Sequence, residues 1–385
     1  MSTKLTQGLV VTRLTLAGLR QRQGASLVIV IGMACVAGVL VTMLSLDVGL
    51  MSVYRATGEP DRALVFSSRA INEYATDLDH AAVDTILNAP GIARDKDARP
   101  LADPEILINA PPADGFAQGS LAIRGLSAQG VALRPRFALV AGRMFAPGRQ
   151  ELMVGVQAGQ VFHFHVGDRI LMPQGEWPIV GAFSGGGLLA SQMLGDADTL
   201  MSATRKRGYG TVLVRLESPA AFAAFRQWLT HNPALAVTAE RQSDYYLRQG
   251  AQLTFYTTMA YLVGAIMSIG ALFGATNILY SAVRTRAREI ATLRAIGYEA
   301  LPLALSVIVE AALLSLVGAL IGCVIAWGLF DGHRSDAFSC IFSWSISAPL
   351  IGLCLSWALL LAVLGSLFPA IRAARLSVAD ALRTS

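Results

Sequence analysis

Four arginines stand between two long apolar segments of this chain, and they constrain its fold more than any other feature. They lie within residues 284–301, after the uncharged run 249–283 and before the stretch 302–330, whose one charged residue is Glu310. A guanidinium group is costly in lipid, whereas arginines gather in the loops on the cytoplasmic side of a bilayer. Residues 284–301 are therefore predicted to form a cytoplasmic elbow between two membrane-spanning helices.

Two further apolar runs complete a set of four membrane helices. A spanning helix needs about 20 apolar residues at a rise of about 1.5 Å each. Every run meets this length, and the 54% hydrophobic composition agrees with it. The sequence predicts transmembrane helices over residues 23–50, 253–283, 302–330 and 346–371.

The distribution of lysine and arginine gives the orientation. Residues 1–22 carry four basic residues and no acid, residues 372–385 carry three arginines and one acid, and the short loop 331–345 carries one arginine. Both termini are therefore expected in the cytoplasm and residues 51–252 outside. The external segment holds 19 basic and 19 acidic residues, so the net charge of +5 comes from the cytoplasmic face. This basicity indicates topology and contact with anionic membrane lipid, not nucleic-acid binding.

The N-terminal segment has the features of an uncleaved anchor. Its polar lead of 22 residues is long, and its apolar run exceeds the roughly 7 to 15 residues of a signal-peptide core. Leucines share one helical face of residues 1–22, which predicts an amphipathic helix at the inner interface of the membrane.

Residues 51–252 read as a mixed α/β domain of two subdomains. Short apolar or alternating runs predict strands, and the part from about 130 to 205 is the richer in strands and glycine, so it is expected to be inserted in the remainder. The domain contains no cysteine, and it must be stabilised by core packing alone. Cys340 in the external loop is expected to be an unpaired thiol. The predicted strands are Ala63 to Phe66, Leu121 to Arg124, Phe137 to Val140, Glu151 to Val156, Trp177 to Phe183 and Thr211 to Leu216.

A search for catalytic chemistry finds weak signals. His163 and His165 would share one face of a strand, but no third metal ligand can be assigned, so a surface or packing role is favoured. Gly185-Gly-Gly187 lacks a following lysine, and the chain contains no P-loop sequence. We therefore predict a protein that is not an enzyme and that holds no metal or cofactor of its own.

Small residues at one-turn spacing occur in two of the membrane segments. Gly270 and Gly274 form one pair, and Gly318 and Gly322 form the other. Such pairs let helix backbones approach closely, so all four are candidates for helix packing. Glu310 lies about 12 Å into its helix when counted from Pro302. An intramembrane acid there is expected to face the protein interior, a partner or water.

These motifs together resemble the FtsX/MacB-type (type VII) permeases of ABC transporters. The resemblance is carried by Gly270-Ala-Leu-Phe-Gly-Ala-Thr-Asn277, by Arg286-x-Arg-Glu-Ile-Ala-x-Leu-Arg-Ala-Ile-Gly297, and by Pro369-Ala-Ile-Arg-Ala-Ala-Arg375. Leu139-Val-Ala-Gly-Arg-x-Phe145 is similar to part of that family's periplasmic core domain. Two departures stand out: Leu376-Ser-Val378 replaces the usual proline, and the fused ATPase of MacB has no counterpart here.

The resemblance implies a permease subunit of a bacterial inner membrane, with residues 51–252 in the periplasm. Its partners would be a separate cytosolic ABC ATPase, which uses the ATP, and a second permease copy or a homologous permease. A periplasmic adaptor and an outer-membrane channel would complete an exporter. Two alternatives remain open: an FtsX-like signalling subunit that activates an external cell-wall hydrolase, and a lipoprotein-release subunit. The residues expected to couple to the ATPase are Arg286, Arg288, Glu289, Ile290, Leu293, Arg294, Ile296 and Gly297.

Overall fold

The computed structural model divides the chain into two compact units, which are described separately. A membrane unit comprises residues 1–47, 254–333 and 344–385, and a sheet unit comprises residues 48–253 and 334–343. The predicted amphipathic helix in residues 1–22 lies outside the described residues. The structure describes residues 23–70, 72–110, 121–172, 174–252, 254–285, 287–296, 299–337 and 340–375.

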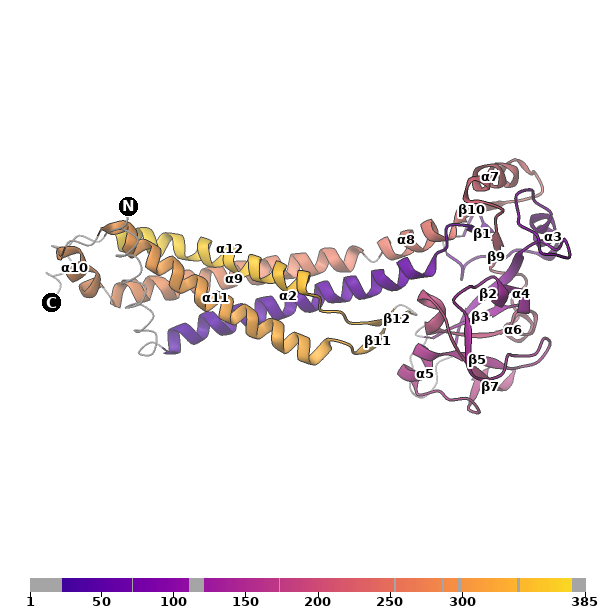
Figure 1. Ribbon diagram of the computed structural model, residues 1–385, viewed down its shortest axis with the longest axis horizontal. Helices are drawn as coiled ribbons and strands as arrows, with labels where there is room; N and C mark the ends of the chain where they lie inside the picture. The colour runs from indigo at the N-terminus through magenta and orange to yellow at the C-terminus, as the bar shows by residue number, and fades with distance from the viewer. Residues whose placement is uncertain are drawn as a thin grey trace. The chain divides into compact units, whose positions relative to one another are not determined.

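Four long apolar helices confirm the predicted membrane spans. Each is long and apolar enough to cross a bilayer. Most of their ends lie within a few residues of the predicted ones, but α2 continues seven residues past the predicted end at residue 50, through Asp47 and Arg55 to Thr57. In the membrane unit, α12 packs along both α11 and α9 (Figure 1). The helices are α2 (Gln23–Thr57), α9 (Thr254–Thr285), α11 (Ala300–Phe330) and α12 (Ala348–Arg375).

The interior of the membrane unit is built mainly from small and β-branched side chains. Val41, Ala319 and Ala358 are almost completely buried. Large apolar side chains point outward instead, as Phe273 and Phe368 do with about 70% of their surface exposed (71% and 69%). This inside-out distribution is what a helix bundle surrounded by lipid requires, since lipid is as apolar as the protein interior.

The described residues of the sheet unit include a ten-stranded mixed sheet. Its strand order is β10-β1-β9-β2-β3-β8-β5-β7-β4, with β6 paired to β7. The pairs β3–β8 and β5–β7 are parallel, and the other pairs are antiparallel. Both predicted subdomains contribute strands to this one sheet. The strands are β1 (Arg62–Ser67), β2 (Ala102–Asn109), β3 (Ala122–Leu126), β4 (Ala138–Gly142), β5 (Leu152–Gly155), β6 (Arg169–Met172), β7 (Gly175–Ser184), β8 (Gln192–Asp196), β9 (Thr211–Arg215) and β10 (Val237–Arg241).

All six predicted strands are present in the structure, within a residue or two at their ends. Four further strands of the large sheet, β2, β6, β8 and β10, are not among the predicted ones, nor are the two strands within residues 331–345, for which the sequence predicts a loop. Strand β2 begins Ala102-Asp-Pro-Glu105, a sequence typical of a turn. Its two acids are nevertheless buried, Asp103 at 1% exposure and Glu105 at 0%. Tertiary contacts therefore override the local preference there.

Short helices cover the sheet and complete its core. Ile106, Ile123 and Trp177 are fully buried at the centre of that core. Helix α3 is capped by the Asp79 side chain, which accepts a hydrogen bond from the Ala82 N–H at 2.7 Å. The helices are α3 (His80–Leu87), α4 (Ala128–Ala132), α5 (Val156–Phe162), α6 (Ala197–Thr204), α7 (Phe222–His231) and α8 (Gln242–Gln252), with the 3-10 helix η2 (Gly187–Ser191).

The segment between α11 and α12 forms a hairpin that belongs to the sheet unit. Strands β11 (Arg334–Ala337) and β12 (Cys340–Ser343) pair with each other. The Ser191 hydroxyl at the end of η2 accepts a hydrogen bond from the Ile341 N–H at 3.1 Å and donates one to the Ile341 carbonyl at 3.3 Å. Ile341 is part of the main core. Cys340 is a free thiol and is fully buried.

Candidate functional site

The predicted cytoplasmic elbow contains a short helix, α10 (Ala287–Ala295), between α9 and α11. Arg294 in its last turn donates a hydrogen bond to the carbonyl of Ala374 at 3.2 Å. Ala374 lies in the last turn of α12, where carbonyl groups lack helical partners and a positive charge is favourable. Arg294 therefore attaches α10 to the end of α12.

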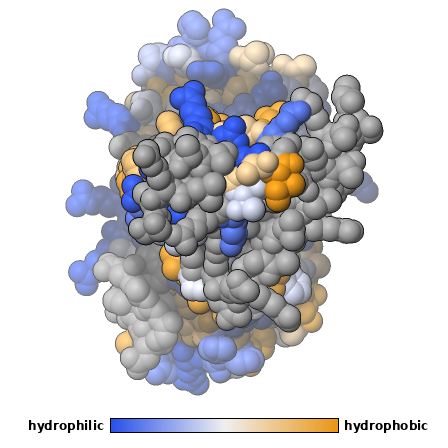
Figure 2. Space-filling view, turned by 90° about the vertical axis from the view of Figure 1, so that its left-hand side faces the viewer, coloured by the Kyte–Doolittle hydropathy of each residue, from blue (hydrophilic) through white to orange (hydrophobic). Residues whose placement is uncertain are grey.

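One side of α10 is buried and another is open. Ala291 is 1% exposed, whereas Ile296, which follows the helix, is 72% exposed. Glu289 is also exposed. At the end of the molecule where α10 lies, hydrophilic and hydrophobic side chains adjoin on the described surface (Figure 2). This combination of an exposed apolar side chain and neighbouring charges is typical of a protein interface.

The other predicted elbow residues are described in part. Arg288, Ile290 and Leu293 lie in α10, but their side chains are outside the described set. Arg286 and Gly297 lie outside the described residues altogether. The role of all eight elbow residues in ATPase coupling stays a prediction.

A second arginine fixes the end of α12 to α9. Arg372 donates a hydrogen bond from Nη1 to the Tyr280 hydroxyl at 3.1 Å. Its guanidinium carbon also lies 4.8 Å from the centre of the Tyr280 ring, which is a cation–π contact. The ends of α9, α10 and α12 are therefore joined to one another by two arginines.

The two glycine pairs have different surroundings. A Cβ added to Gly318 or Gly322 would collide with the backbone carbonyls of Val30 and Ala34, so α11 and α2 approach closely at these glycines. A Cβ added to Gly270 or Gly274 would meet nothing within 4 Å. This second pair lines an apolar groove between α2 and α9, with Gly32, Met33, Met267 and Ile278 also in its walls.

Glu310 lies inside the helix bundle. Its exposure is 9%, and it takes part in a polar or electrostatic interaction there. This acid is expected to face the protein interior, a partner or water, and in the structure it faces the protein interior.

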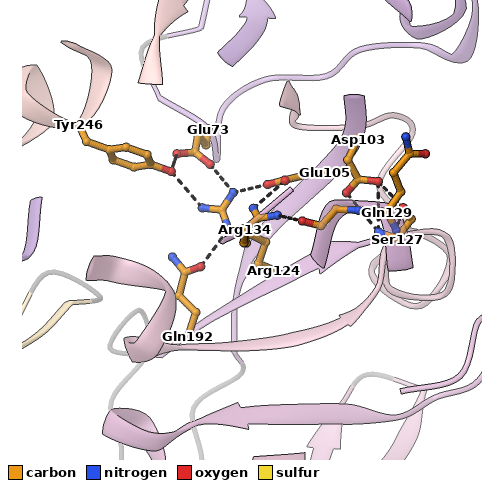
Figure 3. A network of polar contacts seen from close by, with 10 residues as sticks. Glu73, Asp103, Glu105, Arg124, Ser127, Gln129, Arg134, Gln192 and Tyr246 are labelled. Carbon is orange, nitrogen blue, oxygen red and sulfur yellow. Dashed lines mark hydrogen bonds and ion pairs between the residues drawn. The ribbon is translucent and has the colours of Figure 1, made fainter. Parts of the chain in front are cut away.

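A buried ionic network, which sequence reasoning missed, lies at the centre of the sheet unit (Figure 3). Arg124 on β3 donates from Nη1 to Glu73 Oε2 and to Glu105 Oε2, each at 2.7 Å. Its Nε donates to the Gln192 side-chain oxygen on β8 at 2.9 Å. Arg134 donates to the other oxygen of Glu105 at 2.6 Å. The network thus connects β2 and β3 through buried charged groups, and it reaches β8 through the neutral amide of Gln192.

Helix α8 is held to this network by two tyrosines. The Tyr246 hydroxyl donates to Glu73 Oε1 at 2.9 Å, and the Tyr245 hydroxyl accepts from the Glu73 backbone N–H at 3.1 Å. Burial raises the pKa of both phenols well above the usual value, so both remain neutral. Helix α8 ends at Gln252 and α9 begins at Thr254, so the fastened helix is separated by one residue from a membrane helix.

The charges of the network compensate one another. Burial by itself would raise the pKa of Glu105, but Arg134 and Arg124 outweigh this effect and hold that pKa below the usual range. Asp103, two residues earlier, differs. Burial and repulsion from Glu105 raise its pKa to about 7, although the Ser127 hydroxyl and N–H donate to it. The same strand therefore carries one ionised and one partly protonated acid at neutral pH.

One sequence signal could have revealed this network. Arg124 stands alone in the apolar run Leu121-Ala-Ile-Arg-Gly-Leu126, and a charge in a buried strand requires partners of opposite charge. The oppositely charged partners are Glu73 and Glu105, which no local pattern connects to Arg124.

The histidines at 163 and 165 and the glycine run 185–187 have structural roles. His163 ends α5 in a left-handed backbone conformation with φ of 59°. The His165 N–H donates to the Asp168 side chain at 2.7 Å. Gly187 has a φ of 59° and lies so close to Thr57 that a side chain there would collide with it. The glycine run therefore allows the end of α2 to approach η2.

Comparison with known proteins gives a family match and likenesses to solved structures, of which two are described. Residues 261–378 match the family model described as FtsX-like permease C-terminal. A comparison with curated proteins gives no match. The periplasmic region of MacB from Actinobacillus actinomycetemcomitans is similar at 13% identity and a TM-score of 0.38, covering 51% of this chain and 94% of that one.

The second structural likeness also has low identity and covers about half of this chain. It is the extracellular domain of the noncanonic ABC-type transporter YknZ from Gram-positive bacteria, at 12% identity and a TM-score of 0.36. It covers 46% of this chain and 99% of the other. The family match, by contrast, covers α10, α11, α12 and most of α9, but neither α2 nor the ten strands of the large sheet.

Proposed function

We propose that this chain is an FtsX/MacB-type permease subunit of an ABC transporter, and that it couples ATP hydrolysis in a separate cytosolic ATPase to motion of its sheet unit. The match of residues 261–378 to the FtsX-like permease model supports the first part of this proposal. The protein would lie in a bacterial inner membrane with both termini in the cytoplasm and the sheet unit in the periplasm. On this proposal the isolated chain neither binds nor hydrolyses ATP, because the nucleotide site belongs to the partner.

The observation that carries the proposal is the continuity of α2. This helix runs without a break from Gln23 to Thr57, and its 35 residues give a length of about 52 Å at about 1.5 Å per residue. The hydrocarbon core of a bilayer is only about 30 Å thick. The chain passes from the membrane unit to the sheet unit within this helix, between Asp47 and Val48. A continuous helix transmits displacement along its axis because its backbone hydrogen bonds resist bending.

The C-terminal end of α2 is fixed to the sheet unit by polar contacts. The Thr57 hydroxyl accepts a hydrogen bond from the Leu188 N–H at 2.9 Å, and Arg136 donates to the Ala56 carbonyl at 3.2 Å. Glu59, just beyond the helix, donates its backbone N–H to the Gln242 side chain of α8 at 3.2 Å. Movement of this end of α2 would therefore displace both the sheet and α8.

The cytoplasmic end of the mechanism would be the elbow. Ile296 and the apolar residues of α10 would enter a groove on the ATPase, with Glu289 and the neighbouring arginines around them. Buried apolar anchors supply most of the energy of such interfaces, and rim charges adjust their association. The attachment of α10 to α12 by Arg294 would pass the displacement on to the helix bundle.

The proposed assembly contains two permeases. The groove beside Gly270 and Gly274 would receive a helix of the second copy or of a homologous permease, since open glycines allow close backbone approach. The moving sheet units would drive export of a substrate through a periplasmic adaptor and an outer-membrane channel.

The lever role of α2 can be tested by breaking the helix. Insertion of three glycines after Asp47 should leave the elbow and its ATPase intact but uncouple the two units. We expect normal co-purification of the ATPase and loss of the nucleotide-dependent change in distance between spin labels placed at Ser202→Cys in the two copies.

A matched insertion provides the control. Three glycines after Lys96, in an exposed turn, should leave the nucleotide-dependent distance change as it is in the unmodified protein. A helix-broken protein whose labels still respond to nucleotide would show that α2 is not the lever.

A further inference from the structure

A cleft in the sheet unit is lined by four arginines. Two of them, Arg124 and Arg134, belong to the ionic network, and Arg62 and Arg136 line the same cleft. Arg62 is 6% exposed, whereas the side chain of Arg136 is 56% exposed. Buried guanidinium groups therefore form the floor of the cleft, and an exposed one stands at its mouth.

Arg62 lacks the close acidic partners that Arg124, Arg134 and Arg136 have. Within the part of the chain that the structure describes, its buried Nε has no hydrogen-bond partner. The nearby carboxylate of Asp61 is 3.9 Å from Nε, too far for a hydrogen bond, and it accepts one from Arg215 at 3.1 Å. Burial lowers the pKa of Arg62 more than its acidic neighbours raise it. A buried donor of this kind usually has a partner, so it requires an explanation.

Three of the four cleft arginines have an acidic side chain close to their guanidinium groups. Glu73 and Glu105 balance Arg124 and Arg134. Glu59 lies 3.6 Å from Arg136 and balances it. Arg62 has only the more distant carboxylate of Asp61, which also accepts a hydrogen bond from Arg215.

Neutral donors stand beside this charge. The side-chain oxygen of Gln192 accepts from Arg124, and that of Gln242 accepts from the Glu59 N–H. Both amides line the cleft, and with their oxygens occupied they present NH₂ groups, which are donors. The cleft thus combines a positive charge with hydrogen-bond donors.

We propose that this cleft binds the carboxylate group of a small ligand. A guanidinium group presents parallel N–H donors that match the two oxygens of a carboxylate. A monoanionic carboxylate would pair with Arg62, whereas a phosphate dianion would add a second negative charge close to Glu59. The cleft lies entirely in the sheet unit, so ligand binding requires neither the ATPase nor the motion proposed above.

Calorimetric titration of the full chain in detergent tests the proposal, with propionate as the probe. We expect saturable binding at millimolar concentration, no binding of the neutral isostere propionamide, and binding of inorganic phosphate at least about tenfold weaker. Arg62→Gln should weaken propionate binding at least about tenfold. Arg169→Gln, the same change at an exposed arginine of β6 outside the cleft, should leave it unchanged.

A second variant keeps the test valid if the Arg62→Gln protein does not fold. Arg136→Gln changes only the exposed mouth of the cleft and should weaken propionate binding a few-fold. The proposal is overturned if propionate does not bind, if phosphate binds more tightly, or if neither arginine variant changes the affinity.

Discussion

Gly322 in α11 lies directly against the backbone of Ala34 in α2, so that a Cβ on residue 322 would overlap the Ala34 carbonyl. Gly318, one turn earlier, meets Val30 in the same way. The pair Gly270 and Gly274 has the same spacing in α9 but faces an open groove. The same glycine spacing therefore allows close packing against α2 in α11, whereas in α9 it faces an open groove.

Substitution by leucine should have different effects at the two glycine pairs. Gly322→Leu forces α11 away from α2, at a cost of about 1–3 kcal/mol or more for overpacking, and should lower the yield of folded protein in detergent. Gly274→Leu should leave the folded yield unchanged and reduce the crosslinked pair of copies. Normal crosslinking of the Gly274→Leu protein would mean that its groove faces lipid.

The ionic network should dominate the stability of the sheet unit. Arg124→Met removes the partner of two buried acids, and breaking such a pair costs about 3–5 kcal/mol. Arg169→Met removes an exposed ion pair with Glu176, which is worth at most about 1 kcal/mol. Denaturant unfolding of the two full-length variants measures the difference. Equal losses of stability would show that the network is not essential.

Asp103 should make stability depend on pH. Its pKa is raised from 3.8 to about 7 in the folded protein, so the folded state holds the proton more tightly than the unfolded state does. The contribution of this carboxyl to stability is fully present below about pH 4 and is lost as pH rises through 7.

Asp103→Asn should remove this dependence. The variant should gain stability relative to the original protein on the order of a few kcal/mol at pH 8, and less at pH 5. Thermal unfolding across this range measures the difference, and Asp84→Asn, at an exposed position of α3, should give no such trend. A constant difference between the Asp103→Asn and original proteins at all pH values would contradict the shift.

A negative charge introduced in the elbow should leave the isolated protein folded but prevent binding of an ATPase. Ile296 is 72% exposed, so Ile296→Asp should leave the fold intact. In a desolvated groove the same carboxylate costs several kcal/mol, and the ATPase should no longer co-purify. Leu171→Asp, at a residue of β6 that is 66% exposed, is the matched control and should retain the ATPase. A bound ATPase in the Ile296→Asp protein would exclude the elbow from docking.

Thiol labelling in intact cells should give the topology. A membrane-impermeant maleimide should label Ser202→Cys in the sheet unit and spare Glu299→Cys beside the elbow. Native Cys340 should stay silent, because it is fully buried and burial raises its pKa to about 12, which leaves almost no reactive thiolate. Labelling of both introduced cysteines to the same extent would contradict the proposed orientation.

The sequence by itself was sufficient for the features that depend on composition over many residues. The four membrane helices follow from uncharged runs that exceed the bilayer thickness. Six strands follow from apolar patterns bounded by turn residues. The family resemblance came from motifs at 270–277, 286–297 and 369–375, within the residues that match the FtsX-like permease model.

Only the tertiary structure decided which side chains meet. The partners of Arg124 come from positions 73 and 105 and from Gln192. Strand β2 forms despite its turn-like start because Glu105 pairs with two arginines and Asp103 accepts hydrogen bonds from Ser127. Ser191 and Ile341, 150 residues apart, join the β11–β12 hairpin to the sheet unit. Such contacts depend on the spatial arrangement of segments far apart in the chain, and local periodicity carries no information about that arrangement.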